Sequence, residues 1–196
     1  TASSSNPTVS TFIPTGNRSL SVTVLQGDAM SPTISGDMTF QLFEGRAPRA
    51  AQRIIDLAEA DFYNGSIFHR VIDDFVVQGG DPNGVPPGTG GSTLGNFDDQ
   101  FHPDLQHNTI GMLSMAKTFD DTNDSQFFIT EFTAGDSGSI QSLRGLDSQH
   151  TVFGFQTTGE VTRAAISEVA TDVNSRPTND VVLTDVSIFV DNENGV

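Results

Sequence analysis

Residues that could attack a peptide bond occur in the run Gly135-Asp136-Ser137-Gly138. A serine between aspartate and glycine has the form of a protease nucleophile motif, and the aspartate has the form of half an aspartic protease site. Either mechanism needs a second block, which is a histidine with an aspartate or another Asp-Ser/Thr-Gly. The sequence contains no convincing second block in the required order. We therefore expect residues 135–138 to form a flexible loop rather than a catalytic motif.

Thiol, phosphate and metal sites have still weaker support. The sequence has no cysteine, which excludes disulfides, thiolate catalysis and cysteine-based zinc sites. The Gly-rich stretch 84–95 has neither the GxGxxG nor the GxxxxGK[ST] pattern, so it does not predict a phosphate-binding loop. The acidic runs 120–124 and 191–195 could attract Ca²⁺, but neither fits the EF-hand pattern. We expect no metal and no cofactor.

Another set of polar and aromatic residues recurs in ordered blocks along most of the chain. The blocks are Phe68-His69-Arg70-Val71-Ile72 with Phe75-Val76-Val77-Gln78-Gly79-Gly80-Asp81, then 88–91 (GTGG), 113–116 (LSMA), 123–129 (NDSQFFI) and 150–154 (HTVFG). In this order they resemble the signature of cyclophilins. Residues 40–43 and 47–48 likewise resemble the family's strand and first helix. The number and common order of the blocks argue against chance similarity.

The resemblance implies a peptidyl-prolyl cis/trans isomerase and assigns roles to individual residues. It implies that Arg70 is the catalytic residue, beside a pocket for the proline ring. The implied pocket residues are Phe75, Val76, Phe128, Leu146 and His150. Gln78 and the backbone of Ala116 would hold the substrate chain, and His69, Lys117 and Gln126 would lie close by. The expected partners are Pro-containing peptides and unfolded protein chains.

The chemistry of prolyl rotation supports these residue types independently. Twisting a peptide bond loses amide resonance and meets a barrier of about 18–20 kcal/mol. X-Pro bonds therefore exchange in tens to hundreds of seconds in water. In the twisted state the prolyl nitrogen becomes pyramidal and gains a lone pair. A fixed guanidinium such as that of Arg70 can donate a hydrogen bond to this nitrogen only in that state, which is differential binding of the transition state.

The sequence departs from the family at positions that bear on ligand preference. Many cyclophilins have a tryptophan at the pocket rim, where this chain has Arg144-Gly145 before Leu146 and no tryptophan anywhere. Val76 stands where methionine is frequent, Lys117 stands where asparagine is common, and the link between Thr130 and Leu146 is longer than usual. We expect the isomerase reaction to survive these changes, and cyclosporin to bind with reduced affinity.

The highlighted residues also have structural interpretations. A strand arginine such as Arg70 is usually a surface charge, and the motif around it favours catalysis instead. His69 fits a structural hydrogen-bonding role, because the reaction transfers no proton. His150 fits either a pocket wall or support of the barrel. Phe75 and Phe128 are of a type that usually lies in the core, and their place in the signature favours the pocket.

The charge balance bears on partners. Acidic residues outnumber basic ones 25 to 9, the formal net charge is -16, and Lys117 is the only lysine. Such a surface repels phosphate backbones, so nucleic acid is not an expected partner. No apolar run approaches the roughly 20 residues that a membrane span needs.

The elements that must position these residues are mostly short strands. Alternation of apolar and polar residues predicts strands over 20–25 and 38–43, around a turn-rich link, 27–37. Shorter strands are predicted over 67–71, 75–78, 110–116, 126–130, 152–156 and 181–190. Helical spacing predicts helices from Ala47-Pro48 to Phe62 and over 160–169. The predicted fold is mainly β: a closed antiparallel eight-stranded β-barrel capped by two α-helices, cyclophilin-like.

The predicted organisation has three parts. Residues 1–19 form a linker-like extension, in which Val9, Phe12 and Ile13 could form one short strand; 20–191 form the cyclophilin-like domain; and 192–196 form a C-terminal tail. The linker-like start favours a piece of a larger bacterial protein that is secreted or at the cell surface, with a cytoplasmic location as the alternative. Two functions stay open: an active isomerase, or a low-turnover module that binds proline segments within a larger secreted protein.

Overall fold

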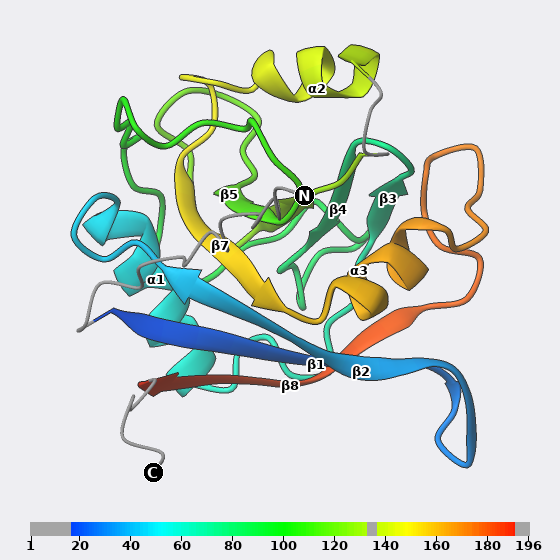
Figure 1. Cartoon of the computed structure of the whole chain (residues 1–196). Helices are drawn as coiled ribbons and strands as arrows, with labels where there is room; N and C mark the ends of the chain where they lie inside the picture. Colours follow the sequence, from blue (N-terminus) through cyan, green and yellow to red (C-terminus); the bar gives the residue numbers. More distant parts are fainter. Residues whose placement is uncertain (1–16, 133–136, 191–196) are drawn as a thin grey trace, which may run out of the picture.

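The computed structural model describes residues 17–132 and 137–190, and its main feature is one antiparallel sheet that curls around the core (Figure 1). The strands are β1 (Arg18–Asp28), β2 (Ser31–Leu42), β3 (Arg70–Ile72), β4 (Val76–Gly79), β5 (Met112–Met115), β6 (Phe127–Thr130), β7 (Val152–Thr158) and β8 (Val181–Val190). Their order across the sheet is β3-β4-β6-β5-β7-β2-β1-β8. The predicted mainly β class with eight antiparallel strands is confirmed.

Alternating side chains explain the long hairpin of β1 and β2. Leu20, Val22 and Val24 are almost fully buried, and the residues between them are partly exposed. Leu20 lies opposite Phe40, and Val22 lies opposite Met38. Residues directly opposite in an antiparallel pair share a face of the sheet, so both strands direct one apolar face to the core.

The sheet is a curled half-barrel, which corrects the prediction of a closed barrel. Its edges are β3 and β8, which do not pair with each other as strands. Where the edges approach, Ile67 and Val182 form an isolated bridge. The physical reason is position: at β3 the neighbouring chain is the segment before β8, because the Val71 N–H donates to Ser175 O at 2.8 Å and β8 begins only at Val181.

Two further differences concern segments that the sequence predicts as irregular. Most of the link 27–37 is strand, because β2 begins at Ser31 and the turn occupies only residues 29–30. The described part of the predicted flexible loop at 135–138 begins a helix, α2 (Ser137–Arg144). The predicted strand at Val9, Phe12 and Ile13 lies outside the described residues.

The described residues contain three helices rather than the two predicted. The expected helices are α1 (Pro48–Glu59) and α3 (Glu160–Ser167). The additional α2 is rich in serine, but Ile140 and Leu143 are spaced by three residues and pack on a small apolar cluster. Tertiary packing of one apolar face therefore stabilises a segment of modest helix propensity.

The main core lies between the sheet and α1. Ile54 and Ile55 of α1 are fully buried there, and so is Tyr63 just beyond the helix. The Tyr63 ring makes an edge contact with Phe127, with 5.7 Å between the ring centroids, and its hydroxyl donates to Ser125 O at 3.0 Å. This core therefore supports β6, whose outer residues reach the candidate site.

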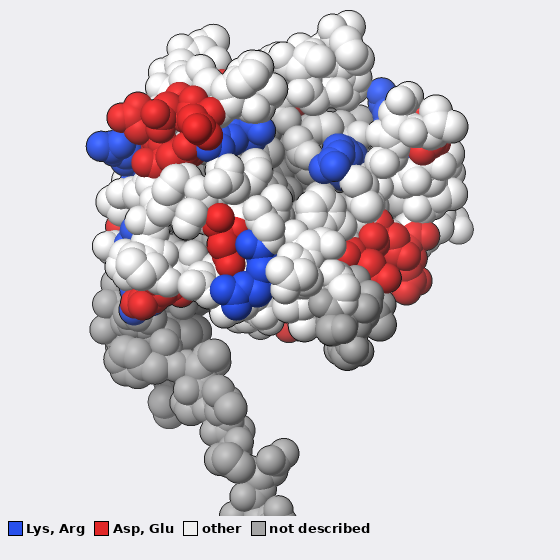
Figure 2. Space-filling model, turned by 90° about the horizontal axis from the view of Figure 1, so that it is seen from above, with Lys and Arg blue, Asp and Glu red and all other residues white. Residues whose placement is uncertain are grey.

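Charged side chains are unevenly spread over the surface. Seen from above, two acidic clusters lie on opposite sides of one face, and basic side chains and a smaller acidic group lie between them (Figure 2). No helix among the described residues is long and apolar enough to cross a membrane.

Candidate active site

The register of β3, β4 and β6 places the predicted catalytic residue beside its predicted neighbours. Arg70 on β3 lies opposite Gln78 on β4, and Gln78 lies opposite Phe128 on β6. Because directly opposite residues of antiparallel strands share one face, a guanidinium, an amide and an aromatic ring stand in a row. The neighbouring strands β3 and β4 and the distant strand β6 therefore build one surface.

A chain of hydrogen bonds holds the polar side of this surface. Arg70 Nη1 donates to Gln78 Oε1 at 3.2 Å, and Gln78 Nε2 donates to Gln126 Oε1 at 3.1 Å. Gln126 Nε2 in turn donates to the carbonyl oxygens of Gly88 at 3.0 Å and Gly90 at 2.8 Å. The orientation of Arg70 is thus fixed, through two glutamines, by the backbone of the Gly-rich loop.

The Gly-rich loop is itself organised by Asp81. In the sequence this residue is only the last one of the block 75–81, and no role was predicted for it. The buried Asp81 carboxylate accepts backbone N–H groups from Gly84 at 2.7 Å, Gly88 at 2.6 Å and Gly90 at 2.9 Å. A Cβ atom at Gly84 or Gly90 would collide with this carboxylate, so the loop can wrap so closely only with glycine there. Asp81 is therefore the anchor of the loop 82–91.

The apolar side of the surface is a small cluster separate from the main core. Its buried members are Val76, Phe128, Phe132 and Leu143, and the partly buried residues packed on them are Phe75, Ile110, Ala116, Ile140 and Leu146. The predicted pocket residues Phe75, Val76, Phe128 and Leu146 therefore do come together. Partial exposure of Phe75, Ala116 and Leu146 leaves apolar surface for a ligand.

Two histidines flank Phe128. His150 makes an edge contact with the Phe128 ring, with 5.3 Å between the ring centroids, and its Nδ1–H donates to Met115 O at 2.9 Å. His107 stacks on Phe128 at 5.8 Å. His107 Nδ1 donates to Asp147 Oδ1 at 3.1 Å, and its Nε2 lies 3.0 Å from Ser114 Oγ. A neutral imidazole satisfies both contacts if Ser114 donates to Nε2.

Burial shapes the electrostatics of the site. Loss of solvent lowers the pKa of His150, and it lowers the pKa of the fully buried His107 to about 4. Desolvation also lowers the pKa of Arg70, whose guanidinium is partly buried, although arginine stays charged at any physiological pH. The site therefore combines neutral imidazoles with one partly desolvated cation, a setting in which its hydrogen bonds are strengthened.

His69 lies under the loop rather than in the pocket. It is buried, and its ring faces Gly88, where an added Cβ would stand 3.2 Å from Nε2. Neither ring nitrogen has a hydrogen-bond partner among the described residues. Desolvation lowers the His69 pKa. His69 directly precedes Arg70 in the sequence, but the structure does not place its ring among the pocket residues.

Lys117 does not present a free charge to the site. Its ammonium forms ion pairs with Asp99 and Asp120, and its side chain is only 5 % exposed. It lines a cavity of about 660 Å³ together with Gln78, Ala116 and Gln126. The cavity also includes Gly88, Gly90 and Phe119 and runs beside the hydrogen-bond chain. Its volume is in the range typical of ligand pockets.

Sequence reasoning missed several residues of the apolar cluster. His107, Phe132 and Leu143 were not predicted for the site, and they line or support Phe128. The spacing of Ile140, Leu143 and Leu146 was the available signal, because it marks one face of a helix. At the rim, Gly145 is exposed and the Arg144 guanidinium pairs with Asp147, so neither replaces an indole. Reduced cyclosporin affinity stays a prediction.

The candidate site thus combines an apolar cluster with a guanidinium that is held by a hydrogen bond. The family model described as cyclophilin type peptidyl-prolyl cis-trans isomerase/CLD matches residues 29–188. The chain belongs to this family, and it is an isomerase of X-Pro peptide bonds.

Curated relatives and solved structures agree with this family. The chain is 37% identical over 156 residues to peptidyl-prolyl cis-trans isomerase-like 1 of Neurospora crassa, covering 79% of this chain and 89% of the relative. It is 40% identical over 147 residues to the isomerase ppi1 of Schizosaccharomyces pombe, covering 74% and 88%.

A similar solved structure is a cyclophilin type isomerase of Cryptosporidium parvum, with a TM-score of 0.74, 30% identity, and coverage of 88% of this chain and 98% of that one. The same protein in the presence of the dipeptide Ala-Pro gives a TM-score of 0.70 at 30% identity, covering 85% and 98%.

Proposed function

We propose that the protein accelerates rotation of X-Pro bonds in unfolded or flexible chains, with Arg70 as the catalytic residue. The apolar cluster around Phe128 takes the proline ring, and Phe75, Val76, Leu146 and His150 border it. The carbonyl side of the bond swings while the ring stays in place. Arg70 then donates to the pyramidal prolyl nitrogen, which accepts a hydrogen bond only in the twisted state.

The observation that carries this proposal is the hydrogen bond of 3.2 Å from Arg70 Nη1 to Gln78 Oε1 beside the Phe128 cluster. It holds the guanidinium before substrate arrives, so little reorganisation is needed when the bond twists. Each tenfold rate gain needs about 1.4 kcal/mol of transition-state stabilisation. One charged hydrogen bond in a partly desolvated site is worth about 1.5–3 kcal/mol, which supplies one to two factors of ten.

The test compares Arg70→Ala with Arg70→Lys and with Arg144→Ala, which removes a half-exposed guanidinium on α2. Exchange NMR on a short Ala-Pro peptide measures the interconversion rate, and urea unfolding measures stability. We expect Arg70→Ala to lose at least about tenfold in activity, because the hydrogen bond to nitrogen is lost. Arg70→Lys should restore little, because an ammonium lacks the planar fork.

The stability cost of Arg70→Ala should be small, about 1 kcal/mol or less, because its hydrogen-bond partner Gln78 keeps a second contact with Gln126. Arg144→Ala should leave catalysis within about twofold of the native rate. Near-native turnover of Arg70→Ala would show that another group stabilises the transition state.

The alternative function is a low-turnover module that binds proline segments of a larger protein. No contact in the described residues favours it over the isomerase. The same exchange experiment separates the two, because a binding module would show peptide titration without acceleration at micromolar protein.

A further inference from the structure

A second cavity, of about 300 Å³, shares one wall with the proline pocket. His150 lines this cavity, and the same imidazole contacts Phe128 of the proline pocket. We propose that the cavity is a subsite for an uncharged apolar side chain of the substrate peptide, two or three residues away from the proline. The inference rests on the proposed isomerase function and adds a substrate preference to it.

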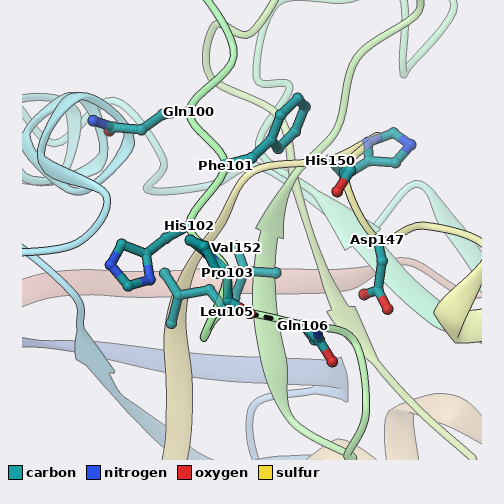
Figure 3. A pocket seen from close by; sticks show the side chains of 10 residues that line it. Gln100, Phe101, His102, Pro103, Leu105, Gln106, Asp147, His150 and Val152 are labelled. Atoms are coloured by element: carbon teal, nitrogen blue, oxygen red, sulfur yellow. Dashed lines mark hydrogen bonds between the residues drawn. The ribbon is translucent and has the colours of Figure 1, made fainter.

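The lining of the cavity is apolar at its centre. Figure 3 shows Val152, Pro103 and Leu105 close together, with Phe101 and His150 near one another beyond them. The Phe101 side chain is 47% exposed, so its ring keeps apolar surface in water. A ligand side chain that covers this surface gains free energy in proportion to the area it removes from water.

Three polar side chains of the lining already have partners. The Asp147 carboxylate accepts from the backbone N–H of His107 at 2.7 Å and pairs with Arg144 Nε at 3.2 Å. Gln106 Oε1 accepts from Arg144 Nη2 at 3.3 Å, and His102 Nδ1 accepts from the backbone N–H of Asp104 at 3.2 Å.

These pairings decide which side chains the cavity accepts. A charged ligand group would lose water without gaining a free partner of opposite charge, and this is costly. An uncharged apolar side chain avoids that cost. The lining therefore selects against acidic and basic residues and favours leucine or phenylalanine.

Size and distance limit the occupant to one side chain. The cavity volume is at the lower end of the range for small-ligand pockets, too small for a folded peptide segment. The centroids of Phe128 and His150 are 5.3 Å apart, so the cavity begins about one ring beyond the proline pocket. An extended chain advances about 3.3–3.6 Å per residue, and the second or third residue from the proline therefore reaches past this ring.

The test uses peptides with a constant Ala-Pro centre and alanine elsewhere. One residue at a time, at the second or third residue from the proline on either side, is changed to Phe, Leu or Glu. Exchange NMR gives the catalytic efficiency, and NMR titration gives the dissociation constant of each peptide. At one of these positions we expect Phe and Leu to improve both quantities about three- to tenfold over alanine, and Glu to give no gain.

Two variants and a matched control assign the effect to the cavity. Phe101→Ala removes apolar wall, and Gln106→Trp fills the mouth. Both should abolish the gain from Phe or Leu while leaving the all-alanine peptide nearly unaffected. Phe189→Ala is the control, because Phe189 is 38% exposed on β8 and lines neither cavity. This control should keep the full preference.

The possible outcomes separate the subsite from the isomerase function. Turnover of the all-alanine peptide without any Phe or Leu gain, or a gain that survives both cavity variants, would overturn the subsite and leave the isomerase intact. Absence of turnover for every peptide would refute the isomerase proposal. The titrations would then decide the subsite, which stands only if Phe and Leu still tighten binding and Phe101→Ala removes that gain.

Discussion

His107 links the stability of the protein to pH through a single buried ring. It lies under Phe128, its side chain is 1% exposed, and both ring nitrogens have partners in the neutral form. Protonation would place a charge in this buried position and remove the acceptor that Ser114 uses. Desolvation accordingly lowers the His107 pKa to about 4. An ordinary histidine in the unfolded chain has a pKa of about 6.5.

The direction of the pH effect follows from this difference. Between about pH 6.5 and pH 4 the unfolded chain binds more protons than the folded one, so stability falls as the pH falls through this range. The contribution of His107 is on the order of 3 kcal/mol and should be fully present at pH 7. His150 and His69 act in the same direction, because desolvation lowers the pKa of each.

We therefore predict that urea unfolding gives a clearly lower stability at pH 5 than at pH 7, and that His107→Gln flattens this dependence. The variant itself should be less stable at pH 7 because it disturbs the packing on Phe128. His102→Gln, which changes a histidine that is 35% exposed, is the control and should keep the native pH profile. An unchanged slope in His107→Gln would contradict the assignment.

Among the elements, the loop 82–91 decides whether Arg70, the proposed catalytic residue, is held. Asp81 accepts backbone N–H groups of the loop, the loop accepts from Gln126, and Gln126 leads through Gln78 to Arg70. Hydrogen bonds to a charged acceptor are worth about 1.5–3 kcal/mol each, so the anchor is strong. Asp81 reaches Arg70 only through this chain of hydrogen bonds, so we assign it a positioning role.

We predict that Asp81→Asn lowers kcat about tenfold or more with a smaller change in KM. The amide turns one acceptor into a donor that faces backbone N–H groups, so the loop and the glutamine chain shift. Asp185→Asn, an exposed residue on β8, is the control for loss of one negative charge. A fully folded Asp81→Asn protein with native kcat would restrict Asp81 to a structural role.

The sequence predicted the elements whose patterns are local and missed those that depend on distant contacts. β8 was predicted with its observed ends because residues 181–190 are rich in valine and other β-branched residues. α2 was missed because its serine-rich composition favours a loop, while Ile140 and Leu143 become informative only when the Phe128 cluster is known. Whether the edges β3 and β8 close a barrel is a long-range question that no local pattern answers.

The same division holds for the candidate site. Arg70, Gln78, Phe75 and Phe128 were identified because they belong to a recognisable signature, and the structure brings them together. Their roles stay predictions. The ion pair of Lys117 with Asp99 was not foreseen, because Asp99 is 18 residues away and contacts it only in the fold.

For the whole molecule, the dominant property is its formal net charge of -16. The field of such a surface attracts cationic peptides, and salt screens it to about 8 Å at physiological ionic strength. The sequence left open whether Lys117 opposes this attraction at the site. The structure places its ammonium against Asp99 and Asp120, so it adds little positive charge there.

We predict that Ala-Pro peptides with lysine more than three residues from the proline, outside the proposed subsite, are turned over more efficiently than matched glutamate peptides at low ionic strength, and that the preference fades as salt is added. Catalytic efficiencies at low and high salt measure this, with a Gln-flanked peptide as the neutral reference. A preference for Glu peptides would show that a local cation dominates the site. Equal rates at low salt would show that substrate charge does not contribute to specificity.

The buried Tyr63 gives this protein an unusual optical property. The chain has one tyrosine and no tryptophan, and the Tyr63 hydroxyl donates to the carbonyl of Ser125, the residue before Gln126. Desolvation raises the Tyr63 pKa well above its ordinary value, so the phenol does not ionise while the core is closed. Its fluorescence therefore reports on one place in the core next to β6. A tryptophan carried by a peptide would contribute the only indole emission in the sample, so binding could be followed by light from the ligand alone.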